Sequence, residues 1–135
     1  MPGPSTPLLG LTVPTVGGDI NAWGAELNAD LALLDALGAA QVLIISSNTI
    51  VALTQPVTII LAISGGTGVT ITLPNPSFNK GRMVWVKKTD TGVGPVTLVP
   101  ASGQIEGGNN YQLVNRLQSV ILAPDAVNWW AFAGQ

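Results

Sequence analysis

After residue 38 the sequence is a series of short apolar runs, each closed within a few residues by Gly, Pro, Asn or Asp. Short runs rich in β-branched residues and bounded by turn-forming residues are typical of strands. The pattern predicts nine strands, over residues 42–45, 49–53, 57–63, 69–73, 82–88, 96–99, 111–114, 119–123 and 128–132. Nine short strands predict a mainly β chain whose strands form a single antiparallel β-sandwich or barrel.

One of these runs differs from the others in its polarity. The runs 69–73 and 83–87 alternate between apolar and mixed positions, as strands with one buried face do. The run from Val57 to Ile63 is apolar at nearly every position. This pattern predicts a strand covered by the core on one face and by a partner on the other, with Val57, Ile59 and Leu61 as candidate interface residues.

The chain also carries few charges for a soluble protein. Only 9% of its 135 residues are charged and 47% are hydrophobic, whereas ordinary soluble domains are about 25% charged. A surface this apolar is expected to be hidden by neighbouring subunits. The net charge is −2 with five basic residues, too few for a surface that follows phosphates, so we expect no nucleic-acid partner.

We also expect no membrane partner and no disulfide. The apolar stretch 42–63 is broken by Ser46-Ser47-Asn48-Thr49 and by Thr54-Gln55-Pro56, so it falls short of the roughly 20 apolar residues of a spanning helix. The first seven residues contain no basic residue, which argues against a secretory signal. The chain has no cysteine, which is compatible with assembly in a reducing cytoplasm.

Residues 1–18 are rich in proline and glycine, which favours an extended arm over a helix. The arm is not polar, so it is expected either to remain free or, as we favour, to dock on a neighbour. The candidate docking residues of the arm are Leu8, Leu9, Leu11, Val13 and Val16.

Residues 19–38 predict one amphipathic helix, with Asp19 as the capping residue and Gly38 at its end. Its apolar stripe consists of Ile20, Trp23, Leu27, Leu31, Leu34 and Leu37, spaced three or four apart. A helix of this length is marginal alone in water, so it must pack on the chain's own sheet, on sister helices or in a socket of another protein. The β-sandwich domain then spans residues 39–135.

The sequence offers little for catalysis. It contains no histidine and no cysteine, which removes the commonest general base, the thiolate nucleophile and nearly all transition-metal sites. Asp90 and Glu106 are the candidate carboxylate pair of a glycosidase, but both lie in turn-like settings typical of solvated acids. The run 64–68 lacks the features of a phosphate loop and predicts a hairpin turn. We expect no enzyme, no cofactor and no metal.

Three aromatic residues are possible contacts for a ligand or partner: Tyr111, Trp129 and Trp130. Aromatic faces can form a sugar-binding platform. Adjacent residues of a strand point to opposite faces, so one of the two tryptophans is expected in the core. The other is expected to meet a subunit or a glycan.

Two parts of the sequence resemble proteins of tailed bacteriophages. The segment Pro14-Thr15-Val16-Gly17-Gly18-Asp19, followed by Trp23-Gly24 and Leu27-Asn28, resembles the amino-terminal segment of many phage tail-fibre-like proteins, where it tethers a fibre to the virion. The remainder, including Gly81 to Lys88 and Pro124 to Trp129, is similar to a small β-domain of phage appendages, with Ala126 where that domain usually has glycine.

The resemblance implies a non-enzymatic virion structural protein assembled in the host cytoplasm. We expect a homotrimer that is a fibre-type tail appendage or tether, docked on other virion proteins through its arm and helix. The first alternative is a capsid decoration protein or head fibre, and the second is a carbohydrate-binding module for host attachment.

Overall fold

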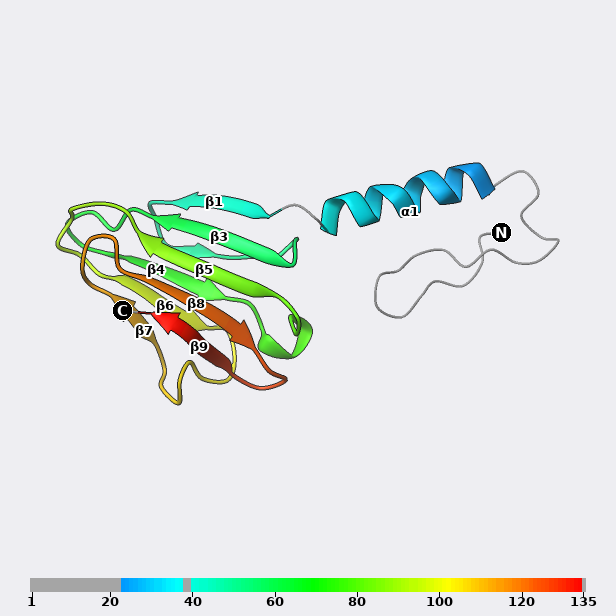
Figure 1. The fold of residues 1–135 in the computed structure, drawn as a ribbon. Coiled ribbons are helices and arrows are strands. Elements are labelled where there is room, and N and C mark those ends of the chain that lie inside the picture. Colours follow the sequence, from blue (N-terminus) through cyan, green and yellow to red (C-terminus); the bar gives the residue numbers. More distant parts are fainter. Residues whose placement is uncertain (1–22, 38–39, 135) are drawn as a thin grey trace. The chain divides into compact units, whose positions relative to one another are not determined.

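The computed structural model describes residues 23–37 and 40–134. The chain divides into two units, residues 1–39 and 40–135, each of which is described by itself (Figure 1). The predicted docking arm lies outside the described residues. So do six of the predicted interface residues: Leu8, Leu9, Leu11, Val13, Val16 and Ile20.

The first unit contains α1, a helix over Trp23–Leu37 that lies within the predicted range 19–38. Its residues include neither proline nor a β-branched side chain, which favours a helix. The expected division into an apolar stripe and a polar face is weak, because alanines and a further leucine, Leu33, fill the positions between the stripe residues. None of the helix side chains that the structure describes is buried, and Leu27, Leu31 and Leu34 are 45–53% exposed.

The second unit confirms that the chain is mainly β. Each of the nine predicted runs overlaps one strand: β1 Gln41–Ile45, β2 Thr49–Ile50, β3 Val57–Ala62, β4 Val69–Leu73, β5 Met83–Lys88, β6 Val96–Pro100, β7 Tyr111–Leu113, β8 Ser119–Pro124 and β9 Trp129–Gly134. A single turn of 3-10 helix, η1 over Pro76–Phe78, lies between β4 and β5. The positions of the strands therefore follow from the spacing of apolar runs and turn residues.

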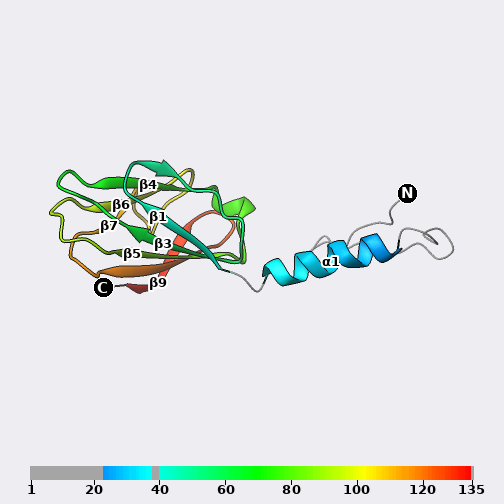
Figure 2. The same cartoon turned by 90° about the horizontal axis from the view of Figure 1, so that it is seen from above.

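The strands form two sheets that face each other as two layers (Figure 2). One sheet has the order β1-β3-β5-β8-β9 and the other β2-β4-β6-β7. Strands β1, β3 and β5 are parallel, as are β2, β4 and β6, whereas β7, β8 and β9 pair antiparallel with their neighbours. The prediction of a single antiparallel sandwich or barrel is therefore wrong, because both sheets are mixed and neither is closed.

The parallel pairing arises because the chain from β1 to β6 alternates between the two sheets. Each pair of strands, β1–β2, β3–β4 and β5–β6, makes one coil, and successive coils stack side by side. Residues 64–68 connect β3 in one sheet to β4 in the other, so the prediction of a hairpin turn there is wrong. A short link can turn the chain between facing layers as readily as it can form a hairpin within one layer.

The core lies between the two layers and is filled by the inward-facing side chains of both sheets. Residues in register on adjacent strands stack into rows, such as Ile45, Ala62 and Lys88 across β1, β3 and β5. The side chains that are fully buried include Ile60, Ile71, Leu73, Val84, Val96, Leu98, Leu113, Leu122 and Trp129. Among the described residues the buried polar side chains are Thr58, Ser64 and Lys88, and Lys88 is the charged one, although its neighbours in the row are Ile45 and Ala62.

The links that join the two sheets at the Lys88 end of the coils pack backbone against backbone. Gly94 N–H donates to the carbonyl oxygen of Gly65 at 3.0 Å, and Val69 N–H to that of Pro95 at 3.0 Å. A Cβ atom at Gly94 would overlap the backbone of Gly68 and Thr67, whereas one at Gly66 would meet nothing within 4 Å. The second and third coils can therefore stack only if residue 94 has no side chain.

We predict that Gly94→Ala lowers the free energy of unfolding by about 2 kcal/mol or more, because overpacking against a backbone forces the links apart. Gly66→Ala is the matched control in the neighbouring link, and we expect a change within about 0.5 kcal/mol. Urea unfolding of both variants checks this, and equal stabilities would show that the close packing of the links is unimportant.

Candidate functional site

The feature of this unit most suited to binding is the outward side of the five-stranded sheet, called here the outer face. One row of apolar residues runs across four strands: Val42 pairs with Ile59, Ile59 with Trp85, and Trp85 with Ile121. A second row joins Ile44 to Leu61 and ends in Lys87 and Ser119. Trp130 and Phe132 extend the face on β9.

The outer face includes the predicted interface strand. In β3 the residues Thr58, Ile60 and Ala62 are buried between the layers, while Val57, Ile59 and Leu61 are half-buried on the outward side. Neighbouring residues are more open: Ile44 is 73% exposed and Trp85 is 44% exposed. The doubly apolar pattern of β3 thus corresponds to one side in the core and one side on an uncovered apolar surface.

The middle of the outer face is hollowed beside Trp85. The hollow has a volume of about 310 Å³ and is lined mainly by outer-face side chains of β3, β5 and β8: Ile59, Leu61, Trp85, Lys87, Ser119 and Ile121. Its polar lining groups lie at one end, where Lys87 and Ser119 are paired in register. An apolar group from another molecule therefore fits the hollow better than a strongly polar one.

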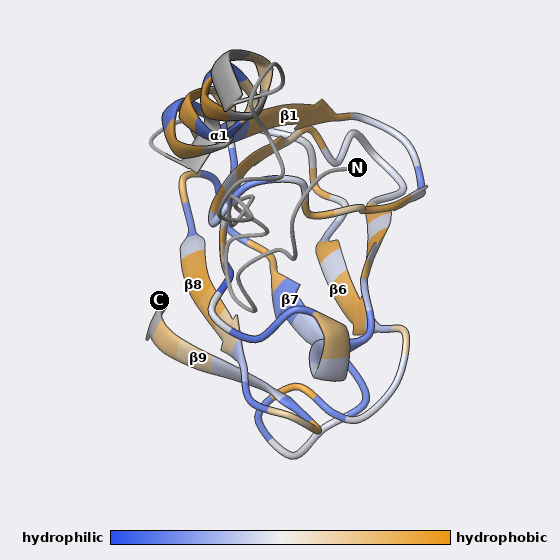
Figure 3. Ribbon diagram, turned by 90° about the vertical axis from the view of Figure 1, so that its right-hand side faces the viewer, coloured by the Kyte–Doolittle hydropathy of each residue, from blue (hydrophilic) through white to orange (hydrophobic). Residues whose placement is uncertain are grey.

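The outward side of the four-stranded sheet is different in character. Thr70, Thr97 and Gln112 are paired in register there, and the Gln112 amide donates to Thr97 Oγ1 at 3.2 Å. Along the strands themselves, Figure 3 shows hydrophobic colour on the visible part of β1 and bands of different hydropathy on β6. A second outward row of this sheet is mixed, because Ile50 pairs with Thr72 and Thr72 with Val99. The outward side of the four-stranded sheet is therefore more polar than the outer face, although Ile50 on it is well exposed.

The three aromatic residues considered for ligand binding do not form one platform. Trp129 is fully buried and its indole N–H donates to the carbonyl oxygen of Pro74, whereas Trp130 is 39% exposed and donates to Asp125 Oδ2 at 2.8 Å. The prediction that one tryptophan lies in the core is confirmed. Tyr111 belongs to the other sheet and packs partly against the core. Sequence reasoning missed Trp85, although its place in an alternating strand indicated an outward position.

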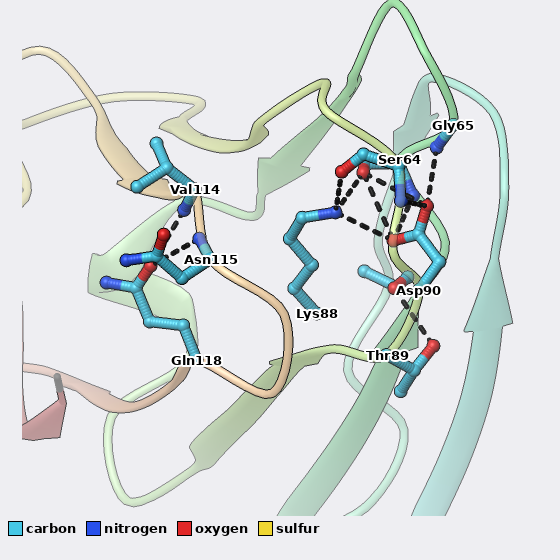
Figure 4. Close-up of polar contacts among 10 residues, drawn as sticks. Ser64, Gly65, Lys88, Thr89, Asp90, Val114, Asn115 and Gln118 are labelled. Carbon is cyan, nitrogen blue, oxygen red and sulfur yellow. Dashed lines mark hydrogen bonds and ion pairs between the residues drawn. The ribbon is translucent and has the colours of Figure 1, made fainter.

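A polar cluster lies at the end of β5, where Lys88 is fully buried (Figure 4). Its ammonium group donates to Asp90 Oδ1 at 2.8 Å, to the carbonyl oxygen of Gly92 at 2.8 Å and to Ser64 Oγ. Burying an ammonium is unfavourable unless it is paired and hydrogen-bonded, and here three acceptors surround it. The cluster joins the link after β3 to the link after β5.

Asp90 is the centre of this cluster and not the solvated loop acid that its turn-like setting predicts. Its carboxylate also accepts hydrogen bonds from the N–H groups of Ser64, Gly65 and Gly92. The pKa of Asp90 is lowered far below its usual range. The largest cause is the hydrogen bond from the Lys88 ammonium, and the backbone N–H donors lower the pKa further. A carboxylate fixed in this way beside a paired lysine is a structural element that connects two coils.

Asp90 and Glu106 lie too far apart to act as a glycosidase pair. Asp90 precedes the first residue of β6 and Glu106 follows its last residue, Pro100. Glu106 is bound to Ala131, which pairs with Leu122, and Leu122 pairs with Val84 at the start of β5. Asp90 lies beyond Lys88 at the other end of β5, about 13 Å away at 3.3 Å per residue. The two carboxyls of a glycosidase are about 5–9.5 Å apart. Glu106 instead accepts a hydrogen bond from Ala131 N–H and so holds the loop after β6 against β9.

The described residues, 23–37 and 40–134, contain no helix long and apolar enough to cross a membrane. Within the same residues no group of three or more carboxylates or other ligand residues could hold a metal ion. Comparison with models of protein families, with curated proteins and with solved structures finds no match to this chain.

We predict that Asp90→Asn lowers the thermal unfolding midpoint at neutral pH, because it leaves the buried Lys88 ammonium without its counter-charge. Folding lowers the pKa of Asp90. The ionised carboxylate therefore stabilises the folded chain above the ordinary aspartate pKa of about 4, and this stabilisation is lost as the pH falls below about 4 toward the lowered pKa. The variant should therefore lose less stability than the wild type between about pH 4 and pH 2.

The control is the double variant Lys88→Met, Asp90→Asn, which removes both charges together. Replacing a whole buried pair is far less harmful than removing one partner. We expect the double variant to be more stable at neutral pH than Asp90→Asn alone. A double variant less stable than the single variant would show that Lys88 does not depend on Asp90.

Proposed function

We propose that this chain is a non-enzymatic structural protein of a bacteriophage virion, a fibre-type tail appendage or tether subunit. In this proposal it assembles with copies of itself, most simply as a homotrimer, and docks on other virion proteins through its arm and α1. The observation that supports it most is α1 itself. Leu27, Leu31 and Leu34 are about half exposed, in a helix whose other residues include alanines and four polar side chains, Glu26, Asn28, Asp30 and Asp35.

The leucines of a helix normally pack against another element. The 15 residues of α1 are also about the lower limit at which an isolated helix is marginally stable in water. In this proposal the contacts that stabilise α1 are made on assembly. The second support is the resemblance of residues 14–28 to the tether segment of phage tail-fibre-like proteins, which overlaps the start of this helix.

The placement on the tail rests on that resemblance, and the capsid exterior is the alternative. Labelling the chain within purified virions and locating the label by electron microscopy separates the two placements. Label at the tail supports the proposal. Label on the head would indicate a capsid decoration protein or head fibre instead. Absence of label from virions would contradict both placements.

We predict that the full chain of 13.8 kDa sediments at micromolar concentration as an assembly, with about 41 kDa expected for the trimer. A variant with Leu27→Asp and Leu34→Asp should fail to enter virions, because charges on α1 prevent its burial. Asn28→Asp is the matched control on the same helix, since it adds an acid at an exposed polar position. A stable wild-type monomer, or normal incorporation of the double variant, would contradict the proposal.

A further inference from the structure

We infer that the outer face is the surface through which two copies of this chain contact each other, with an apolar side chain of one copy seated in the hollow beside Trp85 of the other. The inference rests on the self-assembly in the proposed function and names the surface that carries it. It starts from the contrast between the two sheets of one domain. The four-stranded sheet carries the polar row Thr70–Thr97–Gln112 beside the mixed row Ile50–Thr72–Val99. The row Val42–Ile59–Trp85–Ile121 of the outer face carries no charged, hydroxyl or amide side chain.

The size of the outer face matches a protein–protein contact. Five large apolar residues on it are well exposed: Val42 by 57%, Ile44 by 73%, Trp85 by 44%, Trp130 by 39% and Phe132 by 71%. An aromatic side chain has a surface of about 150–250 Å². Multiplied by their exposed fractions, the five residues together present an apolar surface on the order of 500 Å². A standard interface buries about 800 Å² per partner, of which somewhat more than half is apolar.

The arrangement of polarity on this face is also that of an interface. Its centre is apolar, and its charged side chain, Lys87, lies with Ser119 at the end of the second row. Interfaces are depleted of charge at the centre and polar at the rim. The long stem of Lys87 can cover apolar surface while its ammonium stays in water.

The occupant is a second copy because the face carries both a hollow and protruding side chains. The hollow of about 310 Å³ corresponds to the liquid volume of roughly ten water molecules. Ile44, on the edge strand β1, and Phe132, on the edge strand β9, are the most exposed of the five large apolar residues and stand at the two sides of the same sheet. A copy of the face therefore supplies groups that fit the hollow.

A saccharide fits this face less well. Each sugar hydroxyl that loses water on binding needs a hydrogen-bond partner, or binding is weakened. The row from Val42 to Ile121 offers one polar group, the indole N–H of Trp85, and the hollow adds the side chains of Lys87 and Ser119 at one end. The same shortage of polar groups that disfavours a glycan favours contact with another apolar protein surface.

The test places a charge on the outer face of the full chain and measures its association. Ile44→Glu and Trp85→Glu should each weaken self-association by about tenfold or more, as charges at the centre of an interface do. Phe78→Glu is the matched control, since Phe78 is 84% exposed on η1, outside the outer face. Sedimentation over a range of concentrations gives the association constants, and near-ultraviolet circular dichroism verifies that each variant is folded.

A second measurement uses the absence of cysteine from the chain. Ile44→Cys and Phe78→Cys each introduce one thiol, at positions that are 73% and 84% exposed in the single chain. If the outer face is covered in the assembly, alkylation at position 44 should be about tenfold or more slower than at position 78. Dilution that dissociates the assembly should bring the two rates together.

The outcomes separate this inference from the proposed function. If the wild type is an assembly but both glutamate variants keep its association constant, or positions 44 and 78 react equally fast within it, the outer-face contact is wrong while self-assembly stands. If the wild type is a monomer at micromolar concentration, the proposed self-assembly fails and the outer-face contact fails with it. Weakened association only in the outer-face variants, together with protection at position 44, supports the inference.

Discussion

A lysine ammonium that is buried between two sheets needs a counter-charge and hydrogen-bond acceptors beside it. In the β-unit this requirement holds together the links that follow β3 and β5. Lys88 continues a row that contains Ile45 and Ala62, so its charge enters the interior at the end of β5. Asp90, Ser64 and Gly92 surround the ammonium, and Asp90 also binds the backbone of the neighbouring link. The same group that neutralises the charge therefore fixes how the second coil stacks on the third.

The sequence predicts the strands of this protein far better than their pairing. The spacing of turn residues places all nine strands because short β-branched runs can hardly form anything else. The antiparallel prediction fails because local periodicity says which residues share a face, but not whether a link returns within one sheet or crosses to the other. The link 64–68 is the clearest example, since glycine-rich residues suit both geometries.

The candidate site was predictable to a similar degree. The doubly apolar pattern of Val57 to Ile63 correctly indicates a strand whose outward residues form part of an apolar surface. The row that extends this surface to Val42, Trp85 and Ile121 depends on the register between strands distant in sequence, which no local pattern contains. Asp90 resembles a solvated turn acid for the same reason, because its partners Ser64 and Gly65 lie in a different link.

The two sheets differ in the polarity of their outward sides. The outward side of the four-stranded sheet carries threonine and glutamine beside Ile50 and Val99, whereas the outward side of the five-stranded sheet is mainly apolar and has a hollow at its centre. A chain with 9% charged residues leaves much apolar surface to be covered by neighbours. In the proposed function α1 supplies part of the covered surface, and in the further inference the outer face supplies another part.

The alternation of strands between layers also affects how a protein of this plan can change in length. In a barrel the number of strands is fixed by closure, but here β1 and β2 form an open side of the stack. A duplication of one coil would add one strand to each sheet and leave the existing rows of the core in place. The unit could then lengthen in whole steps, each step extending the polar side and the apolar side by the same amount.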